Sequence, residues 1–129
     1  MKRFASIILI LVLLVCTAGC SQIRIPKNEL AVLTYDPPIV GNEVRIVETL
    51  TAEESARVRQ ILMDAKHNAG IGGCAYTEEI SFTFDDQVFA VAWDGCETIW
   101  DIQNEKYYEV NKEDWAYIKA LFERYGGKL

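Results

Sequence analysis

The chain has little of what most enzymes and metal sites require. It holds one histidine, His67, and four cysteines in 129 residues, which leaves few ligands for a metal centre or a catalytic triad. It contains no Gly-x-Ser-x-Gly nucleophile elbow, no Ser-x-x-Lys pair and no glycine loop placed to bind phosphate. The sequence therefore assigns no catalytic, cofactor-binding or metal-binding residue, and it indicates that the protein is not an enzyme.

Basic residues are also scarce. The chain has 13 Lys and Arg against 19 Asp and Glu, and its formal net charge is −6. Nucleic-acid binding requires a basic face, so nucleic acid is not an expected partner. The composition is otherwise that of a globular protein, with 50% hydrophobic and 25% charged residues. The length is enough for one domain and a targeting segment.

Long apolar stretches are limited to one, Phe4–Val15, which is shorter than the roughly 20 residues that span a bilayer. It follows a basic N-terminus and precedes small residues, the pattern of a secretory signal peptide. The segment Thr17-Ala18-Gly19-Cys20 resembles the lipobox of small bacterial lipoproteins, although that family usually has an aliphatic residue where Thr17 stands. The resemblance implies cleavage before Cys20 and acylation of its thiol. The alternative is an uncleaved signal anchor in which Cys16 and Cys20 are ordinary residues.

The resemblance also implies a domain organisation and a location. Residues 1–19 would be a removed signal peptide, residues 20–29 a lipidated tether and residues 30–129 a single domain. Cleavage would remove two basic residues and no acidic one, so the mature charge would be −8. The membrane would be a partner through the lipid, with the domain facing outward or into the periplasm. Because anionic head groups repel an acidic protein, we expect the domain to stand away from the surface.

Two cysteines then remain, Cys74 and Cys96, and they are expected to form a disulfide. Paired thiols in an oxidising compartment usually do so, and their spacing suits neither a zinc site nor a Cys-x-x-Cys redox motif. A turn at Asp85-Asp86 lies midway between them and would bring both to one end of a hairpin. In the chain-entropy model a bridge closing a loop of this size contributes about 3 kcal/mol to stability.

The hydrophobic pattern predicts an α+β domain. Residues 30–35 and 44–50 are candidate strands, and Thr51 begins a capping box for a helix over about 52–67 that ends at His67. Alternation then predicts four strands, and Asn111 caps a last amphipathic helix that ends before Gly126-Gly127. The expected fold is a four-stranded antiparallel meander, to which one or two N-terminal strands can be added. Both helices are expected on one face, in the order β-β-α-β-β-β-β-α.

The turns predict a register. A two-residue turn at Asp85-Asp86 places Phe82 opposite Phe89. A two-residue turn at Asp94-Gly95 places Phe89 opposite Trp100, so that Trp100 and Ile102 face the core. A three-residue loop at 104–106 places Ile102 opposite Tyr108. If Asp94-Gly95 is instead a bulge, the two cysteines face each other more directly.

Three functions remain as hypotheses. The first is an interaction or inhibitor-like module that presents its open sheet face or loops to a protein of the cell envelope, with Tyr107 as a candidate exposed residue. The second is a small-molecule or ion sensor that uses acidic residues near the hairpin turns, namely Asp85, Asp86, Asp94, Glu97, Asp101 and Glu105. The third is an enzyme, for which no motif is present.

Overall fold

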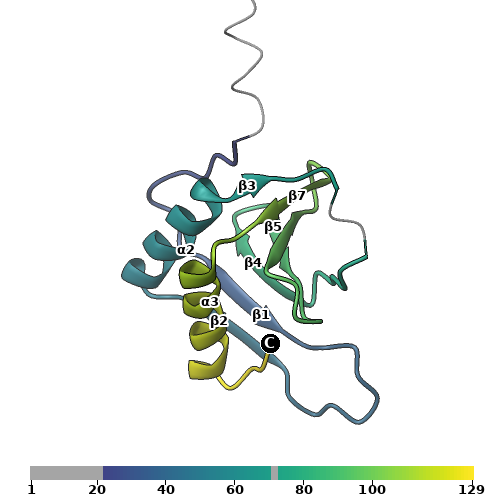
Figure 1. The fold of residues 1–129 in the computed structure, drawn as a ribbon. Coiled ribbons are helices and arrows are strands. Elements are labelled where there is room, and N and C mark those ends of the chain that lie inside the picture. The colour runs from purple at the N-terminus through teal and green to yellow at the C-terminus, as the bar shows by residue number, and fades with distance from the viewer. Residues whose placement is uncertain (1–21, 71–72) are drawn as a thin grey trace, which may run out of the picture.

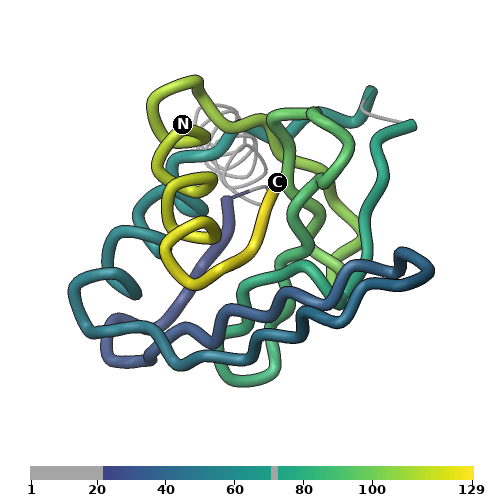
Figure 2. The backbone as a smooth tube through the Cα atoms, turned by 90° about the horizontal axis from the view of Figure 1, so that it is seen from below, coloured from purple at the N-terminus to yellow at the C-terminus, as the bar shows by residue number. Residues whose placement is uncertain are grey.

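The computed structural model describes residues 22–70 and 73–129, which form one antiparallel sheet and two helices. Seven strands lie in the order β2-β1-β4-β5-β6-β7-β3. The α+β fold is confirmed, with one short strand added after the first helix. Figures 1 and 2 show both helices on the same side of the sheet. The strands are β1 (Val32–Tyr35), β2 (Ile46–Thr49), β3 (Lys66–His67), β4 (Ile80–Phe84), β5 (Gln87–Val91), β6 (Thr98–Asp101) and β7 (Lys106–Glu109).

The helix α2 (Ala52–Asp64) begins as the sequence predicts but ends earlier. Thr51 and Glu54 form the expected capping box. Ala65 is extended, and Lys66–His67 then pairs with β7 as strand β3. The expected helical position of His67 is therefore wrong. The edge of β7 offers backbone partners to this segment, and the His67 ring contacts that of Tyr108, with 5.7 Å between centroids.

The helix α3 (Lys112–Arg124) confirms its predicted cap and apolar stripe. The Asn111 side chain accepts a hydrogen bond from the Asp114 amide, and Gly126 adopts φ +97° just beyond the helix. The stripe residues packed into the core are Trp115, Ile118, Leu121 and Phe122. Two ion pairs join α3 to α2, Arg124–Glu54 at 2.7 Å and Arg57–Asp114 at 2.5 Å.

The β4–β5 hairpin has the predicted register. Phe82 lies opposite Phe89, and Phe84 opposite Gln87, so Asp85 and Asp86 form the two-residue turn. Asp85 adopts φ +52°, which short polar side chains tolerate better than most. This hairpin directs its phenylalanine side chains toward the helices, where Phe82 meets Phe122 with 5.2 Å between ring centroids.

The β5–β6 register differs from the prediction by one residue. Phe89 lies opposite Asp101, and Trp100 lies opposite Ala90. Residues 93–97 separate the last bonded pair, in which the Ala92 amide donates to the Thr98 carbonyl at 3.1 Å. Asp94-Gly95 is therefore not a two-residue turn, because the longer loop is built around the disulfide. A one-residue shift turns a strand over, so Ile99 is fully buried and Trp100 faces away from the helices.

The β6–β7 register also differs. Asp101 lies opposite Lys106, Ile99 opposite Tyr108 and Trp100 opposite Tyr107. The expected pairing of Ile102 with Tyr108 is wrong because the loop has four residues, 102–105. The Asp101 carboxylate shapes this loop by accepting hydrogen bonds from the backbone and side-chain nitrogens of Asn104 at 3.2 and 2.8 Å.

The packed core extends toward the N-terminus beyond the expected boundary at residue 30. Ile23 and Ile25 are 4% and 7% exposed and belong to the same hydrophobic cluster as the inner faces of the sheet and helices. The Gln22 side chain donates to the Met63 carbonyl near the end of α2 at 3.4 Å. Residues 22–25 are therefore part of the domain and not of a free tether.

Candidate interaction surface

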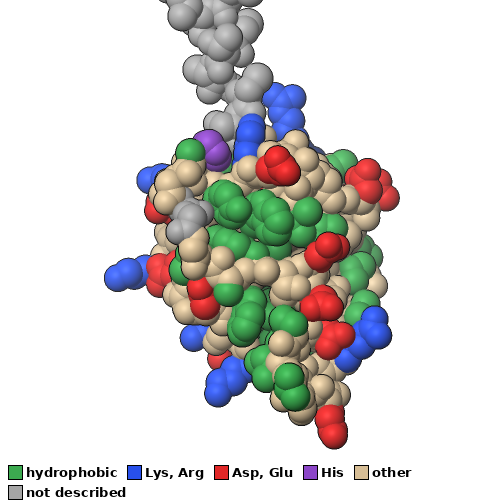
Figure 3. Space-filling view, turned by 90° about the vertical axis from the view of Figure 1, so that its right-hand side faces the viewer, with side chains coloured by type: hydrophobic (Ala, Val, Ile, Leu, Met, Phe, Trp, Pro, Cys, Tyr) green, Lys and Arg blue, Asp and Glu red, His purple; other side chains and the backbone are tan. Residues whose placement is uncertain are grey.

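The sheet face turned away from the helices, here called the outer face, carries a continuous row of cross-strand neighbours. The strand registers join them from one strand to the next across six strands. In sheet order this row is Val47, Thr34, Ser81, Ala90, Trp100 and Tyr107. Figure 3 looks at this side of the molecule and shows hydrophobic side chains gathered over it, with acidic side chains along their border.

Three aromatic residues form the largest feature of the outer face. Trp100 and Tyr107 stack with 6.0 Å between ring centroids and 17° between planes. Tyr76 lies against both, at 6.1 Å from Trp100 and 5.5 Å from Tyr107. All three side chains are half-buried, so part of each ring reaches solvent. We call this group the aromatic cluster.

The aromatic cluster is held in one geometry by polar contacts at its edge. The Tyr76 hydroxyl lies 2.6 Å from the Thr98 hydroxyl, with which it shares a hydrogen bond. Burial raises the pKa of Tyr76, and the negative charge of Asp94 adds to this rise, so the phenol stays protonated at neutral pH. The cluster is thus a neutral surface within an acidic protein.

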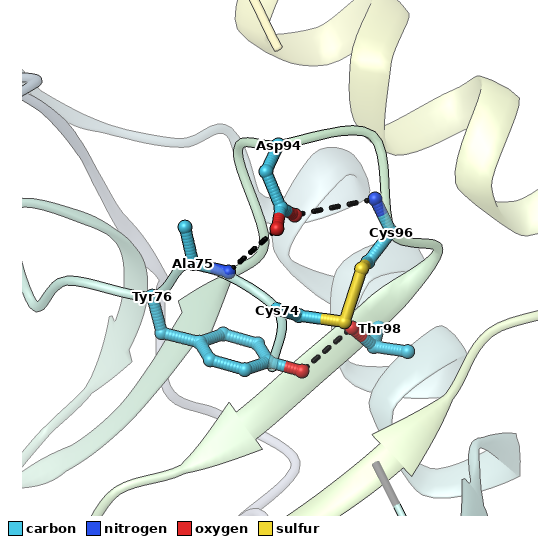
Figure 4. The surroundings of a disulfide bond; sticks show 6 residues. All are labelled: Cys74, Ala75, Tyr76, Asp94, Cys96 and Thr98. Carbon is cyan, nitrogen blue, oxygen red and sulfur yellow. Dashed lines mark hydrogen bonds between the residues drawn. A yellow bond between two sulfur atoms is a disulfide. The ribbon is translucent and has the colours of Figure 1, made fainter. Parts of the chain in front are cut away.

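The predicted disulfide between Cys74 and Cys96 is present and fixes the segment that carries Tyr76. The two Cα atoms are 6.0 Å apart, the usual spacing for a bridged pair. Asp94 accepts a hydrogen bond from the Ala75 amide at 2.8 Å and another from the Cys96 amide at 3.3 Å. Figure 4 shows the bridge and both bonds beside the Tyr76–Thr98 contact. The bridge therefore links the β5–β6 loop to the segment that crosses the outer face.

The local sequence pattern gave no sign of the role of Tyr76, and it predicted the wrong face of the sheet for Trp100. Tyr76 lies outside the regular strands, so alternation could not place it, although its position two residues after Cys74 ties it to the bridge. Trp100 was expected in the core, but it lies on the outer face because of the register shift. Tyr107, whose role the sequence left open, lies beside Trp100 on the outer face.

The β1–β2 hairpin extends the apolar surface to one end of the molecule. Ile39 is 55% exposed, Val40 is fully exposed and Val44 is 45% exposed. Asn42 orders this loop, since its side-chain nitrogen donates to the Val44 carbonyl at 3.0 Å. Its side-chain oxygen accepts from the Val44 amide at 3.3 Å. Figure 1 shows the hairpin projecting beyond the rest of the sheet.

The acidic residues proposed for a sensor do not come together. Asp94 caps the disulfide loop, Asp101 is 3% exposed and holds the β6–β7 loop, and Asp85 forms the β4–β5 turn. Across residues 22–70 and 73–129, the one group of three possible metal ligands is Cys74, Asp94 and Cys96. Both sulfur atoms of that group are bonded to each other, so neither can act as a thiolate ligand.

Cys20 and the lipobox-like segment lie outside the described residues. No helix in the described part of the chain is both long and apolar enough to cross a membrane. No protein-family model matches the chain, and neither a curated protein nor a solved structure is significantly similar to it. The sequence pattern and the geometry of the outer face are therefore the features that indicate a function.

Proposed function

We infer that this chain is a membrane-anchored, extracytoplasmic lipoprotein whose disulfide-stapled domain binds a protein of the cell envelope through its outer face. The observation that carries this proposal is the aromatic cluster of Tyr76, Trp100 and Tyr107, which is ordered yet not covered by either helix. Aromatic side chains provide a large contact area at a small cost in conformational entropy, and they are enriched at protein interfaces.

Charge favours a particular kind of partner. The 22–70 and 73–129 segments contain eleven Lys and Arg against nineteen Asp and Glu, a net charge of −8. A partner with a basic contact surface would be attracted over a distance, and this raises the association rate more than the final affinity. The same charge disfavours nucleic acid.

Two features support the location. The lipobox-like segment supports acylation at Cys20, and the disulfide is of the kind that persists in oxidising compartments outside the cytoplasm. The bridge also has a direct place in the proposed function, because it positions Tyr76 against Trp100. A cytoplasmic protein would be expected to keep both thiols reduced and would lose this constraint.

The test compares two tyrosines of similar exposure on opposite sides of the sheet. Tyr107→Ala removes part of the aromatic cluster, whereas Tyr117→Ala removes a half-buried tyrosine of α3. The full chain and each variant are immobilised and exposed to detergent-solubilised envelope proteins, and bound proteins are quantified by mass spectrometry. We expect Tyr107→Ala to reduce capture of a specific protein about tenfold, equivalent to about 1.4 kcal/mol, with little effect of Tyr117→Ala. If Tyr107→Ala captures as much of that protein as Tyr117→Ala does, binding through the outer face is refuted.

A further inference from the structure

Strand β2 forms one edge of the sheet, and a single hydrogen bond shows which of its backbone groups face the open side. The Leu50 amide donates to the Ala31 carbonyl at 2.8 Å, so these residues form a bonded pair. Bonded and non-bonded pairs alternate along an antiparallel ladder, which makes Glu48 with Leu33 the next bonded pair. The N–H and C=O groups of Val47 and Thr49 therefore point away from β1, toward the open edge.

This edge has few of the features that prevent pairing with another chain. Strand β2 contains no proline, neither helix covers it, and Val47 is 55% exposed. The opposite edge of the sheet differs, since β3 has only two residues. Exposed edge strands present unpaired backbone groups that can template an added strand. The β2 edge is thus a place where a partner can gain backbone hydrogen bonds.

The charge at this edge points to the nature of the added strand. The Glu48 side chain is exposed and its carboxylate has no cation partner among residues 22–70 and 73–129. Because Glu48 uses its backbone groups toward β1, it forms a non-bonded pair with any residue opposite it on the open side. Side chains approach most closely in such pairs, so a lysine or arginine there would meet the carboxylate directly.

We propose that β2 binds an extended basic segment of the protein partner, which adds to the sheet as an eighth strand. The proposal rests on the proposed function and specifies how the partner is held. In the added strand a basic residue lies opposite Glu48 and an apolar residue lies opposite Val47. Backbone hydrogen bonds to Val47 and Thr49 supply the register, and the charge pair supplies specificity.

Two other occupants fit less well. A second copy that pairs Val47 with Thr49 would set Glu48 against its own equivalent, and each copy carries the same net negative charge. The described chain begins at the other side of the sheet, where Gln22 and Arg24 lie with Lys106 and Tyr108 of β7 around one pocket. Under the proposed function only residues 20 and 21 of that segment remain, and they are held at the membrane.

The test uses two short synthetic peptides as probes, one alternating lysine with valine and the other alternating glutamate with valine. Each is titrated into the isotopically labelled full chain in detergent, and backbone amide shifts are followed by NMR. We expect saturable shifts at Val47 and Thr49 with the lysine peptide and at least about tenfold weaker binding of the glutamate peptide. The variant Glu48→Lys reverses this preference.

A backbone variant separates strand addition from simple charge attraction. Val47→Pro removes an outward N–H and leaves the ladder with β1 intact, so peptide shifts are lost, whereas Val40→Pro in the exposed loop leaves them unchanged. If Val47→Pro does not fold, as judged by circular dichroism, the Glu48→Lys reversal still decides the question. Absence of shifts at β2, or a peptide preference that Glu48→Lys leaves unchanged, overturns the proposal. So does a dimer that forms without peptide and is lost in Val47→Pro.

Failure of this proposal is distinguishable from failure of the proposed function. If Tyr107→Ala abolishes capture of the envelope protein while Val47→Pro does not, the outer face binds the partner without an added strand. If neither variant alters capture, binding through the outer face fails together with the strand addition.

Discussion

At the scale of single residues, Glu54 is the clearest case of a buried charge stabilised by its neighbours. The residue is 7% exposed, and its carboxylate accepts hydrogen bonds from the Thr51 amide at 3.1 Å, the Tyr125 hydroxyl at 2.7 Å and Arg124 at 2.7 Å. Burial raises the pKa of Glu54, but the bonds from Tyr125, Thr51 and Arg124 outweigh it, so the pKa lies below its ordinary value. The ionised group thus ties the start of α2 to the end of α3.

This arrangement predicts a pH-dependent stability. A carboxyl group with a lowered pKa in the folded state stabilises the fold above its unfolded-state pKa, and that contribution is lost as pH falls through the folded-state pKa. We expect Glu54→Gln to lower the free energy of unfolding by about 1–3 kcal/mol at pH 7, measured by urea denaturation. The difference in stability from the unmodified chain should narrow as pH falls below about 4.3, the pKa of a glutamate in the unfolded state, and through the lower pKa of Glu54 in the folded state.

The neighbouring exposed residue provides the control. Glu53→Gln removes a charge from the same helical turn without breaking any of these hydrogen bonds, so its effect should stay within about 0.5 kcal/mol. A stability difference for Glu54→Gln that remains constant between pH 7 and pH 3 would show that the ionised state is not what stabilises the fold.

At the scale of elements, local signals predicted where helices and strands begin, while turn geometry decided which side chains they bury. The caps at Thr51 and Asn111 are local, because a short polar side chain meets an amide three residues on. The two-residue Asp85-Asp86 turn preserved the predicted register in the same way. These parts of the fold could be predicted because each depends on neighbours in sequence.

The loop after β5 depends on contacts distant in sequence, and there prediction from local pattern was wrong. The β5–β6 loop is set by the Cys74–Cys96 bridge and by Asp94, which bonds the Ala75 amide nineteen residues away. A turn signal at Asp94-Gly95 carries no information about that partner. The wrong register also left the candidate surface unpredicted, because the aromatic cluster exists only in the observed register.

The register has a direct test in the core. Ile99 is fully buried in the observed pairing, whereas Ile102, expected in the core, is only half-buried in the β6–β7 loop. Ile99→Ala should lower the free energy of unfolding by about 2–5 kcal/mol, and Ile102→Ala should cost clearly less. Urea denaturation of both variants measures the comparison. The reverse order of effects would favour the register that pairs Ile102 with Tyr108.

At the scale of the whole molecule, the packing of Ile23 changes the expected relation to a membrane. Only Ser21 and Gln22 lie between Cys20 and Ile23, and three steps of an extended chain at about 3.5 Å each give a reach of about 10 Å. If Cys20 carries lipid as proposed, the domain sits against the head groups. The expectation that the domain stands away from the surface rested on repulsion between its negative charge and anionic head groups. The burial of Ile23 and Ile25 leaves too little free chain after Cys20 for such a separation.

The anchor is tested by exchanging either of two nearby cysteines. Cys20→Ser should block acylation and release the protein from the membrane fraction, or leave the unprocessed precursor, as seen by fractionation and intact mass. Cys16→Ser provides the matched control, because Cys16 lies in the segment that the proposed processing would remove. Normal processing and full membrane retention of Cys20→Ser would exclude the lipoprotein assignment.

A short link also orients the domain. In Figure 1 the described chain begins at the top, beside β3, whereas the β1–β2 hairpin with exposed Ile39 and Val40 projects at the bottom. A lipid at Cys20 would therefore turn the hairpin toward the interior of the envelope compartment. A partner lying flat in the same leaflet would not reach it. With the proposed anchor, the geometry would favour partners that are soluble in that compartment or that extend toward this membrane from its opposite side.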